Sequence, residues 1–367
     1  MYFGPHVPSA EHVVDLIHMW VGRAGALPLT IKFGWSNRFH PTRKETESNA
    51  DRSLRIYDAL SKYTSRWESL IISLPAGMLA PLSRSDDVPL LRYLSMRIDG
   101  YHGCKVPFLS APRLTTLDIY DLRCKPSKIP TIPWHQLTVL CISEGPSFPT
   151  ALDLIKCCLR LEKLTISCTF NYDRMDERPC RPRIEHATLR EIFVHDRVAD
   201  TRPFLDSLSL PALKRLSLYG SYSSTLTELF NQSNCELESL SLSDSGFDPD
   251  NLQECLEHKS CETLTHLCIT TYGSKLVNDE LLVRLTCYEG EAEGPLCPNL
   301  EQLTFKNFCP WGTSPGVLGR MALSRCVGRP EVKRLQTLDF TARSPLLEED
   351  VELLKCAVLN GLRYRFN

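Results

Sequence analysis

The residues that most resemble catalytic machinery are Gly312–Gly316 (GTSPG), a G-x-S-x-G string between a strand-like and a helix-like segment. In α/β-hydrolases this string presents a nucleophilic serine, and the acid and then the histidine follow it along the chain. Here all ten histidines lie at or before His266, so none follows Ser314. Cys309-Pro310-Trp311 also separates the strand-like segment from the first glycine, which spoils a tight elbow. We therefore interpret the string as a surface turn rich in glycine and proline.

The sixteen cysteines are a second source of chemistry, but their spacing favours neither metal binding nor redox catalysis. No C-x-x-C pair occurs, and the chain has no Walker A sequence, no G-x-G-x-x-G and no H-E-x-x-H. Many cysteines, including Cys141, Cys168 and Cys268, lie in apolar segments, which is typical of reduced, mostly buried thiols. We expect no metal, no cofactor and no enzymatic activity.

The charge pattern narrows the kinds of partner. The net charge is only −2. Two basic clusters, Arg38–Lys44 and Arg174–Arg183, lack aromatic residues on which bases could stack, so we interpret both as solvated loops. We therefore expect no nucleic-acid partner. The chain has no apolar run of about eighteen residues or more, and no basic flank followed by an apolar core at its start. We expect a monomer away from the membrane, in the cytoplasm, with the nucleus left open.

One phrase, L-x-x-L-x-L with other apolar residues allowed, recurs along most of the chain. Its first positions are 23 to 36 residues apart. Self-similarity at about 20–29 residues is the signature of a leucine-rich-repeat array. The eleven matches are Trp67/Leu70/Ile72, Leu91/Leu94/Met96, Leu114/Leu117/Ile119, Leu137/Leu140/Ile142, Leu161/Leu164/Ile166, Leu189/Ile192/Val194, Leu213/Leu216/Leu218, Leu237/Leu240/Leu242, Leu264/Leu267/Ile269, Leu300/Leu303/Phe305 and Leu335/Leu338/Phe340.

The spacing of apolar residues in the phrase is that of a short β-strand. Its last two apolar residues are two apart and so point to one face, and stacked neighbours are needed to bury that face. We therefore predict an α/β fold: an irregular leucine-rich-repeat solenoid, or horseshoe, with a parallel concave sheet and with helices and extended segments on the convex side. Helices are expected within 151–161, 223–233, 248–259 and 278–286, whereas the prolines of 124–136 exclude one. Segments 170–182, 286–298 and 307–316 are expected to be surface loops.

Two terminal segments complete the predicted organisation. Residues 1–46 form an N-terminal cap or linker, including a strand at 28–33. Residues 47–367 form the solenoid, and a capping helix at 348–362 covers its far end, because an exposed apolar end would promote association.

The repeats resemble a particular group, the F-box/leucine-rich-repeat proteins of mushroom-forming fungi. The likeness rests on x-P-x-L-x-x-L-x-L starts and on residues 11–33, where a helix with a glycine-containing break precedes a P-L-x-(I/L)-x-(I/F) strand; the residues concerned are Pro112, Pro211, Pro298, Pro28, Leu29, Ile31 and Phe33. The asparagine that usually closes the repeat phrase is absent at Asp99, Leu122, Gly145, Ser221 and Ser245, so the turns must satisfy their backbone groups differently.

The resemblance implies a protein-interaction module similar to the substrate-recognition part of an F-box ubiquitin-ligase receptor. No residues in 1–50 match the L-P-x-E-like opening of an F-box, so the resemblance does not extend to the contact with the ligase adaptor. The alternative is a stand-alone leucine-rich-repeat binding scaffold with no ubiquitin-ligase role. Loss of the F-box and truncation of the sequence both stay open.

The candidate binding residues are those that flank the buried pair of each strand, because they face the concave side. Tyrosine and arginine among them are types favoured at interface hot spots. The predicted protein-binding residues are Tyr93, Arg97, Asp118, Tyr120, Lys163, Phe193, His195, Arg215, Tyr219, His266 and Lys306. Whether these residues or the inserted loops contact the partner is left open by the sequence.

Overall fold

The computed structural model describes most of the chain and divides it into two compact units, residues 1–161 (unit 1) and 162–367 (unit 2). The described ranges are 9–34, 43–75, 87–99, 110–122, 125–129, 131–144, 147–168, 183–196, 202–220, 226–243, 247–271, 276–288, 294–327, 330–342 and 344–366. Within each unit, parallel strands follow one another in sequence order, and each return segment leads to the next strand.

Unit 1 contains a five-stranded parallel part in the order β1-β2-β3-β4-β5. The strands are β1 (Leu29–Gly34), β2 (Trp67–Pro75), β3 (Tyr93–Asp99), β4 (Thr116–Asp121) and β5 (Val139–Glu144). Two 3-10 turns, η3 (Pro126–Lys128) and η4 (Trp134–Gln136), form the proline-rich return between β4 and β5, where no helix was predicted. The helix α4 (Phe148–Cys157) follows β5, as the 151–161 pattern predicted.

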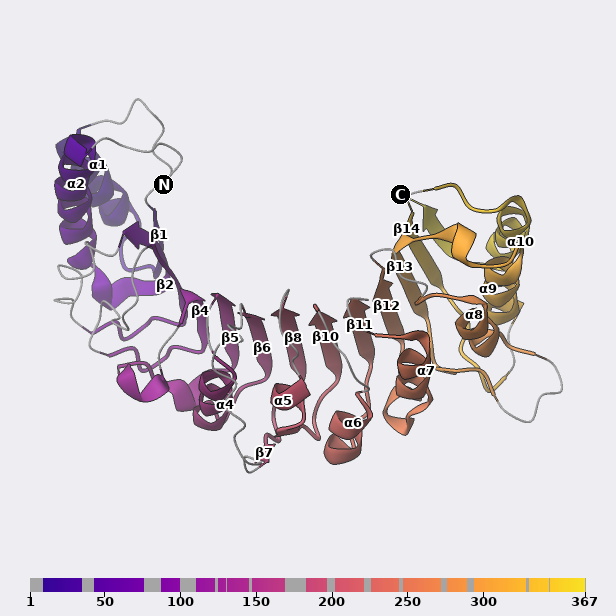
Figure 1. The fold of residues 1–367 in the computed structure, drawn as a ribbon. Helices are drawn as coiled ribbons and strands as arrows, with labels where there is room; N and C mark the ends of the chain where they lie inside the picture. Colours follow the sequence, from indigo (N-terminus) through magenta and orange to yellow (C-terminus); the bar gives the residue numbers. More distant parts are fainter. Residues whose placement is uncertain are drawn as a thin grey trace. The chain divides into compact units, whose positions relative to one another are not determined.

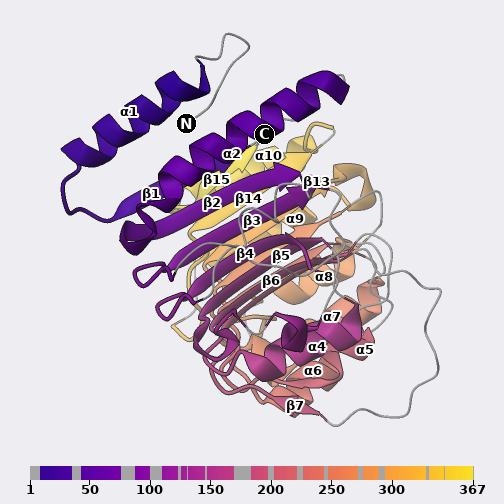
Figure 2. The same cartoon turned by 90° about the vertical axis from the view of Figure 1, so that its left-hand side faces the viewer.

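The start of unit 1 holds one predicted and one unpredicted helix. The helix α1 (Ala10–Arg23) begins with Ser9, whose side chain accepts a hydrogen bond from the amide of His12. The helix α2 (Arg43–Ser61) was not predicted; Figure 2 shows it alongside α1. One contact between this helical region and the next turn is a 2.7 Å hydrogen bond between His18 Nδ1 and Tyr63 Oη.

Unit 2 contains eight strands of the parallel sheet, again in sequence order (Figure 1). They are β6 (Lys163–Cys168), β8 (Glu191–Asp196), β10 (Arg215–Tyr219), β11 (Ser239–Ser243), β12 (His266–Thr270), β13 (Gln302–Phe308), β14 (Thr337–Ala342) and β15 (Arg363–Phe366). The return segments carry α5 (Arg202–Leu205), α6 (Thr227–Ser233), α7 (Pro249–Glu257), α8 (Asp279–Leu285), α9 (Val317–Val327), α10 (Glu348–Leu359) and a separate two-stranded pair, β7 (Ile184–Glu185) with β9 (Leu208–Ser209).

The repeated apolar phrase forms the core on one side of the strands in both units. All residues of its eleven matches are at most 6% exposed. Strand register stacks equivalent positions, as in Leu216↔Leu240 and Leu240↔Leu267. The predicted α/β fold with a large parallel sheet is therefore confirmed, and the order of strands and returns is compatible with a solenoid-like arrangement.

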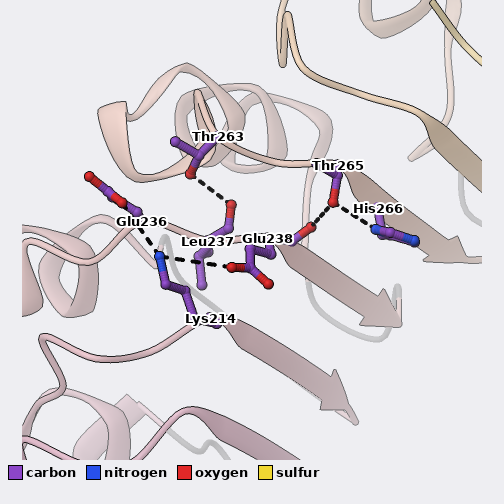
Figure 3. A network of polar contacts seen from close by, with 7 residues as sticks. All are labelled: Lys214, Glu236, Leu237, Glu238, Thr263, Thr265 and His266. Atoms are coloured by element: carbon purple, nitrogen blue, oxygen red, sulfur yellow. Dashed lines mark hydrogen bonds and ion pairs between the residues drawn. The ribbon is translucent and has the colours of Figure 1, made fainter. Parts of the chain in front are cut away.

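The backbone of unit 2 links successive repeats at the start of their strands, away from the positions that an asparagine ladder would occupy. In successive repeats, one carbonyl before a strand accepts hydrogen bonds from two consecutive amides of the next repeat: the amides of Thr265 and His266 both reach Glu238 O at 3.0 Å. Threonine hydroxyls add to this pattern, because Thr265 Oγ1 donates to Glu238 O at 2.9 Å and Thr263 Oγ1 donates to Leu237 O at 2.8 Å (Figure 3). The positions Gly145, Ser221 and Ser245, where the asparagine is missing, lie outside the described residues.

The end of unit 2 corrects one prediction. The helix predicted at 348–362 ends at Leu359, and the chain turns through Gly361, whose φ is +98°, into a further strand, β15. β15 pairs with β14 in parallel, so a strand and not the helix lies at this edge of the sheet. α10 packs instead against α9, where the amide of Gly319 donates to Asp350 Oδ1 at 2.8 Å.

Two predicted loops fall largely outside the described residues. These are 170–182, with most of the basic cluster Arg174–Arg183, and the middle of 286–298. Most of the cluster Arg38–Lys44 also lies there. Segment 307–316 is described and contains the 3-10 turn η7 (Pro310–Gly312).

Candidate protein-binding surface

The eleven candidate residues all lie on strands, at positions that alternate with buried core residues. We call the side of each sheet that bears them the open face. Phe193, for example, lies between the buried residues Ile192 and Val194 and is itself 40% exposed. Because side chains alternate along a strand, the candidates lie on the side of the strands opposite the buried residues.

The open face of unit 1 brings four of the candidates together in two neighbouring strands, β3 and β4. The Arg97 guanidinium carbon lies 4.0 Å from the centre of the Tyr120 ring, a cation–π contact. Ser95 Oγ donates to Asp118 Oδ2 at 3.0 Å, which holds that carboxylate against the sheet. Tyr93 is half-buried, in register with Thr116. This group therefore presents an ordered tyrosine–arginine pair.

The open face of unit 2 holds an aromatic cluster built from β8 and β10. The rings of Phe193 and His195 stack with centres 6.5 Å apart, and the His195 and Tyr219 rings are 4.6 Å apart. His195 Nδ1 also shares a 3.1 Å hydrogen bond with Ser167 Oγ on β6. We call Phe193, His195 and Tyr219 the aromatic cluster. Its three side chains fix one another in place, which lowers the entropy lost when a partner covers them.

An ion-pair row lies beside the aromatic cluster. Lys163 Nζ is 3.1 Å from Glu191 Oε2, and Arg215 Nη1 pairs with Glu191 Oε1. Glu191 is in register with both residues, and its side chain is 28% exposed, less than that of either cation. The sequence prediction named the two cations but missed Glu191. The signal was present, since Glu191 flanks a buried strand residue in the same way as Lys163 and Arg215.

The last two candidates stand apart from these groups. His266 is exposed, and its Nδ1 shares a 2.7 Å hydrogen bond with Thr265 Oγ1 (Figure 3). Lys306 is exposed on β13. Between them and the aromatic cluster lie small residues, Ser239 and Ser241, which leave this part of the open face low in relief.

The structure also describes the G-x-S-x-G string and most of the cysteines, which the sequence analysis did not assign to catalysis or metal binding. Gly312–Gly316 forms the turn between η7 and α9, and the Ser314 amide donates to Asp279 Oδ1 at 2.7 Å. The twelve cysteines whose side chains the structure describes are free thiols. Six of them are buried, so the prediction of mostly buried thiols overstates the pattern among these twelve. Burial raises the pKa of the Cys158 thiol to about 12. Within the described ranges, no three His, Cys, Asp or Glu side chains gather as a metal site would require.

Comparisons with protein families and with curated proteins find no match for this chain. Of the helices in the described part, none combines the length and the apolar run needed to cross a bilayer.

Proposed function

We propose that the chain is a leucine-rich-repeat solenoid that works as a protein-interaction module, with the partner contacting the open face. The observation that carries the proposal is the aromatic cluster of unit 2 with its neighbouring ion-pair row. A phenylalanine that is 40% exposed in the middle of a strand, stacked against a histidine, is a hydrophobic anchor that remains accessible to solvent.

The composition of the cluster suits protein binding better than core packing. Tyrosine and arginine are enriched among residues that dominate binding energy, and such residues are surrounded by neighbours that exclude water. Tyr219 and Arg215 are four residues apart on β10, an even spacing that points both side chains to the same face. Their neighbours on β8 already hold them by ring contact and ion pair, so little rearrangement is required of the unbound protein.

Two versions of this function remain in contention. In the first, suggested by the sequence resemblance, the chain is similar to the substrate-recognition part of an F-box ubiquitin-ligase receptor. In the second, it is a stand-alone binding scaffold with no ubiquitin-ligase role. Both versions use the same open face, and they differ in whether ubiquitin-ligase components bind the chain.

The test is affinity purification of the full chain from a fungal extract, followed by mass spectrometry. A double variant, Phe193→Ala with Tyr219→Ala, removes the aromatic surface. The matched control is Val327→Ala with Leu359→Ala, which removes two apolar side chains that are 59% and 87% exposed at the ends of α9 and α10. Circular dichroism establishes that each variant is folded.

We expect the wild type and the control to capture the same protein, and the aromatic variant to lose it. Cullin-ligase components in the captured set would support the receptor version, and their absence the stand-alone version. Capture of the same partner by the aromatic variant at wild-type yield would refute the proposed surface.

A further inference from the structure

The edge of the sheet in unit 2 forms an open hollow of about 680 Å³ over β13, β14 and β15. Its lining is mixed: polar side chains alternate with apolar and aromatic ones, and two arginines belong to it. The lining residues are Gln302, Thr337, Asp339, Val358, Leu362, Arg363, Tyr364 and Arg365. Pockets that bind ligands commonly have volumes of about 300–1,000 Å³. The hollow therefore has room for a short stretch of peptide.

The two arginines of the hollow differ from the cations near the aromatic cluster. Lys163 and Arg215 share Glu191, whereas Arg363 and Arg365 are exposed and make no ion pair with any described residue. They are two positions apart on β15, so they point to the same face with a spacing of about 6.6 Å. Alternate side chains of an extended peptide have the same spacing, which matches carboxylates at positions i and i+2 to the two guanidinium groups.

Asp339 adds a feature that charge alone does not explain. Its Oδ1 atom is buried and accepts no hydrogen bond from the described residues. Asp339 is in register with Arg365, yet no ion pair joins their side chains. A buried acceptor without a donor is costly, and because this oxygen is closed to solvent, a ligand in the hollow reaches it only after the side chain turns.

We propose that this hollow binds an extended acidic segment of a partner protein, with alternate carboxylates on Arg363 and Arg365. The inference rests on the proposed function, because it takes the occupant to be protein. A second copy of this chain is a poor fit, because pairing β15 with β15 would bring arginines against arginines.

The simplest alternative is that the arginines only protect the edge strand from unwanted pairing, as charged residues often do. That explanation accounts for the positive charge but not for the hollow. The two explanations differ in whether an acidic peptide binds.

The probe is a short fluorescein-labelled peptide of alternating aspartate and valine, titrated with the full chain in a fluorescence anisotropy assay. Its counterpart replaces every aspartate by asparagine. The test variants are Arg363→Gln with Arg365→Gln, and Asp339→Asn alone. The matched control, Arg113→Gln with Arg160→Gln, removes two exposed arginines of unit 1.

We expect the acidic peptide to bind, the asparagine peptide to bind at least about tenfold more weakly, and the Arg363/Arg365 variant to raise the Kd of the acidic peptide roughly tenfold. The control variant should leave the Kd unchanged, and Asp339→Asn, which removes a negative charge from the lining of the hollow, should lower it severalfold.

Equal binding of the two peptides, or an unchanged Kd in the Arg363/Arg365 variant, would overturn the inference. So would an RNA oligonucleotide that binds more tightly than the peptide and displaces it. The extract experiment separates this failure from that of the proposed function, because a partner captured through the aromatic cluster does not depend on Arg363 and Arg365.

Discussion

Replacement of Arg325 by methionine tests how the long insertion between β12 and β13 is held in place. Arg325 lies in α9 and is 0% exposed. Its Nε donates to Leu285 O at 2.6 Å, its Nη1 donates to Cys297 O at 3.1 Å, and its Nη2 donates to Leu296 O. Burial lowers the pKa of Arg325, because desolvation disfavours the charged form. One guanidinium therefore fastens the end of α8 and the segment before β13 to α9.

The magnitude follows from those three contacts. Arg325→Met keeps an apolar stem but removes every donor, so three backbone carbonyls lose a hydrogen bond. Cys297 O keeps the one from the Leu300 amide at 3.0 Å, and the carbonyls of Leu285 and Leu296 lose their side-chain partner. Each buried, unsatisfied group costs about 1–3 kcal/mol, and part of the loss is offset because no charge is buried any longer. We expect unit 2 to lose about 3–5 kcal/mol, a large part of a typical domain stability of about 5–15 kcal/mol.

The assay is urea denaturation followed by circular dichroism, together with hydrogen–deuterium exchange to locate the loss. Exchange should rise first in residues 285–297. The matched control is Arg320→Met, on the same helix but exposed, with an expected change below about 0.5 kcal/mol. A loss of less than about 1 kcal/mol for Arg325→Met, similar to the control, would refute this account of the insertion.

Two further predictions concern the packing of helices. Gly319→Ala should destabilise unit 2 by about 1–3 kcal/mol in urea denaturation, because the new Cβ would lie 2.5 Å from a leucine Cβ of α10. Gly22→Ala in α1, where nothing lies within 4 Å, should instead stabilise unit 1 by up to about 1 kcal/mol; the opposite order would contradict the packing described. Burial raises the pKa of Asp350, so the folded state holds this proton more tightly than the unfolded state, and the carboxyl's contribution to stability falls as the pH rises from about 4. Asp350→Asn should flatten that fall in denaturation curves recorded from pH 4 to 7, and an unchanged slope would contradict it.

The strands were predictable because their signal is local. Each L-x-x-L-x-L phrase contains the alternating apolar residues of a strand and a first apolar residue that packs beneath them. Packing against a similar neighbouring repeat favours the same conformation. The helices α7 and α8 were predictable for a similar reason, since Asp248 and Asn278 cap apolar faces at helical spacing.

The missed elements lack such local signals. The sequence of α2 is rich in charge, and its few buried residues, among them Ile56 and Tyr57, do not stand out against it. β15 is only four residues long and all of them are exposed, so its assignment depends on pairing with β14 rather than on its own pattern.

The sequence predicts which side of the strands the candidate residues occupy, but it does not predict which of them contact one another. Alternation along each strand was sufficient to place all eleven candidates on the open face. The pairing of Glu191 with Lys163 and Arg215, by contrast, joins strands that are more than twenty residues apart in sequence and requires the register between them. The same holds for Asp339 beside Arg365.

The most direct test of the central claim is hydroxyl-radical footprinting of the chain, alone and with the captured partner. Oxidation is measured at open-face aromatics, Phe193 and Tyr219, and at an exposed aromatic outside that face, Trp311, which is 71% exposed in η7. We predict that the partner protects Phe193 and Tyr219 while Trp311 keeps its rate of oxidation. Protection of Trp311 with unchanged oxidation of Phe193 and Tyr219 would contradict the account, and would place the partner on the inserted loop.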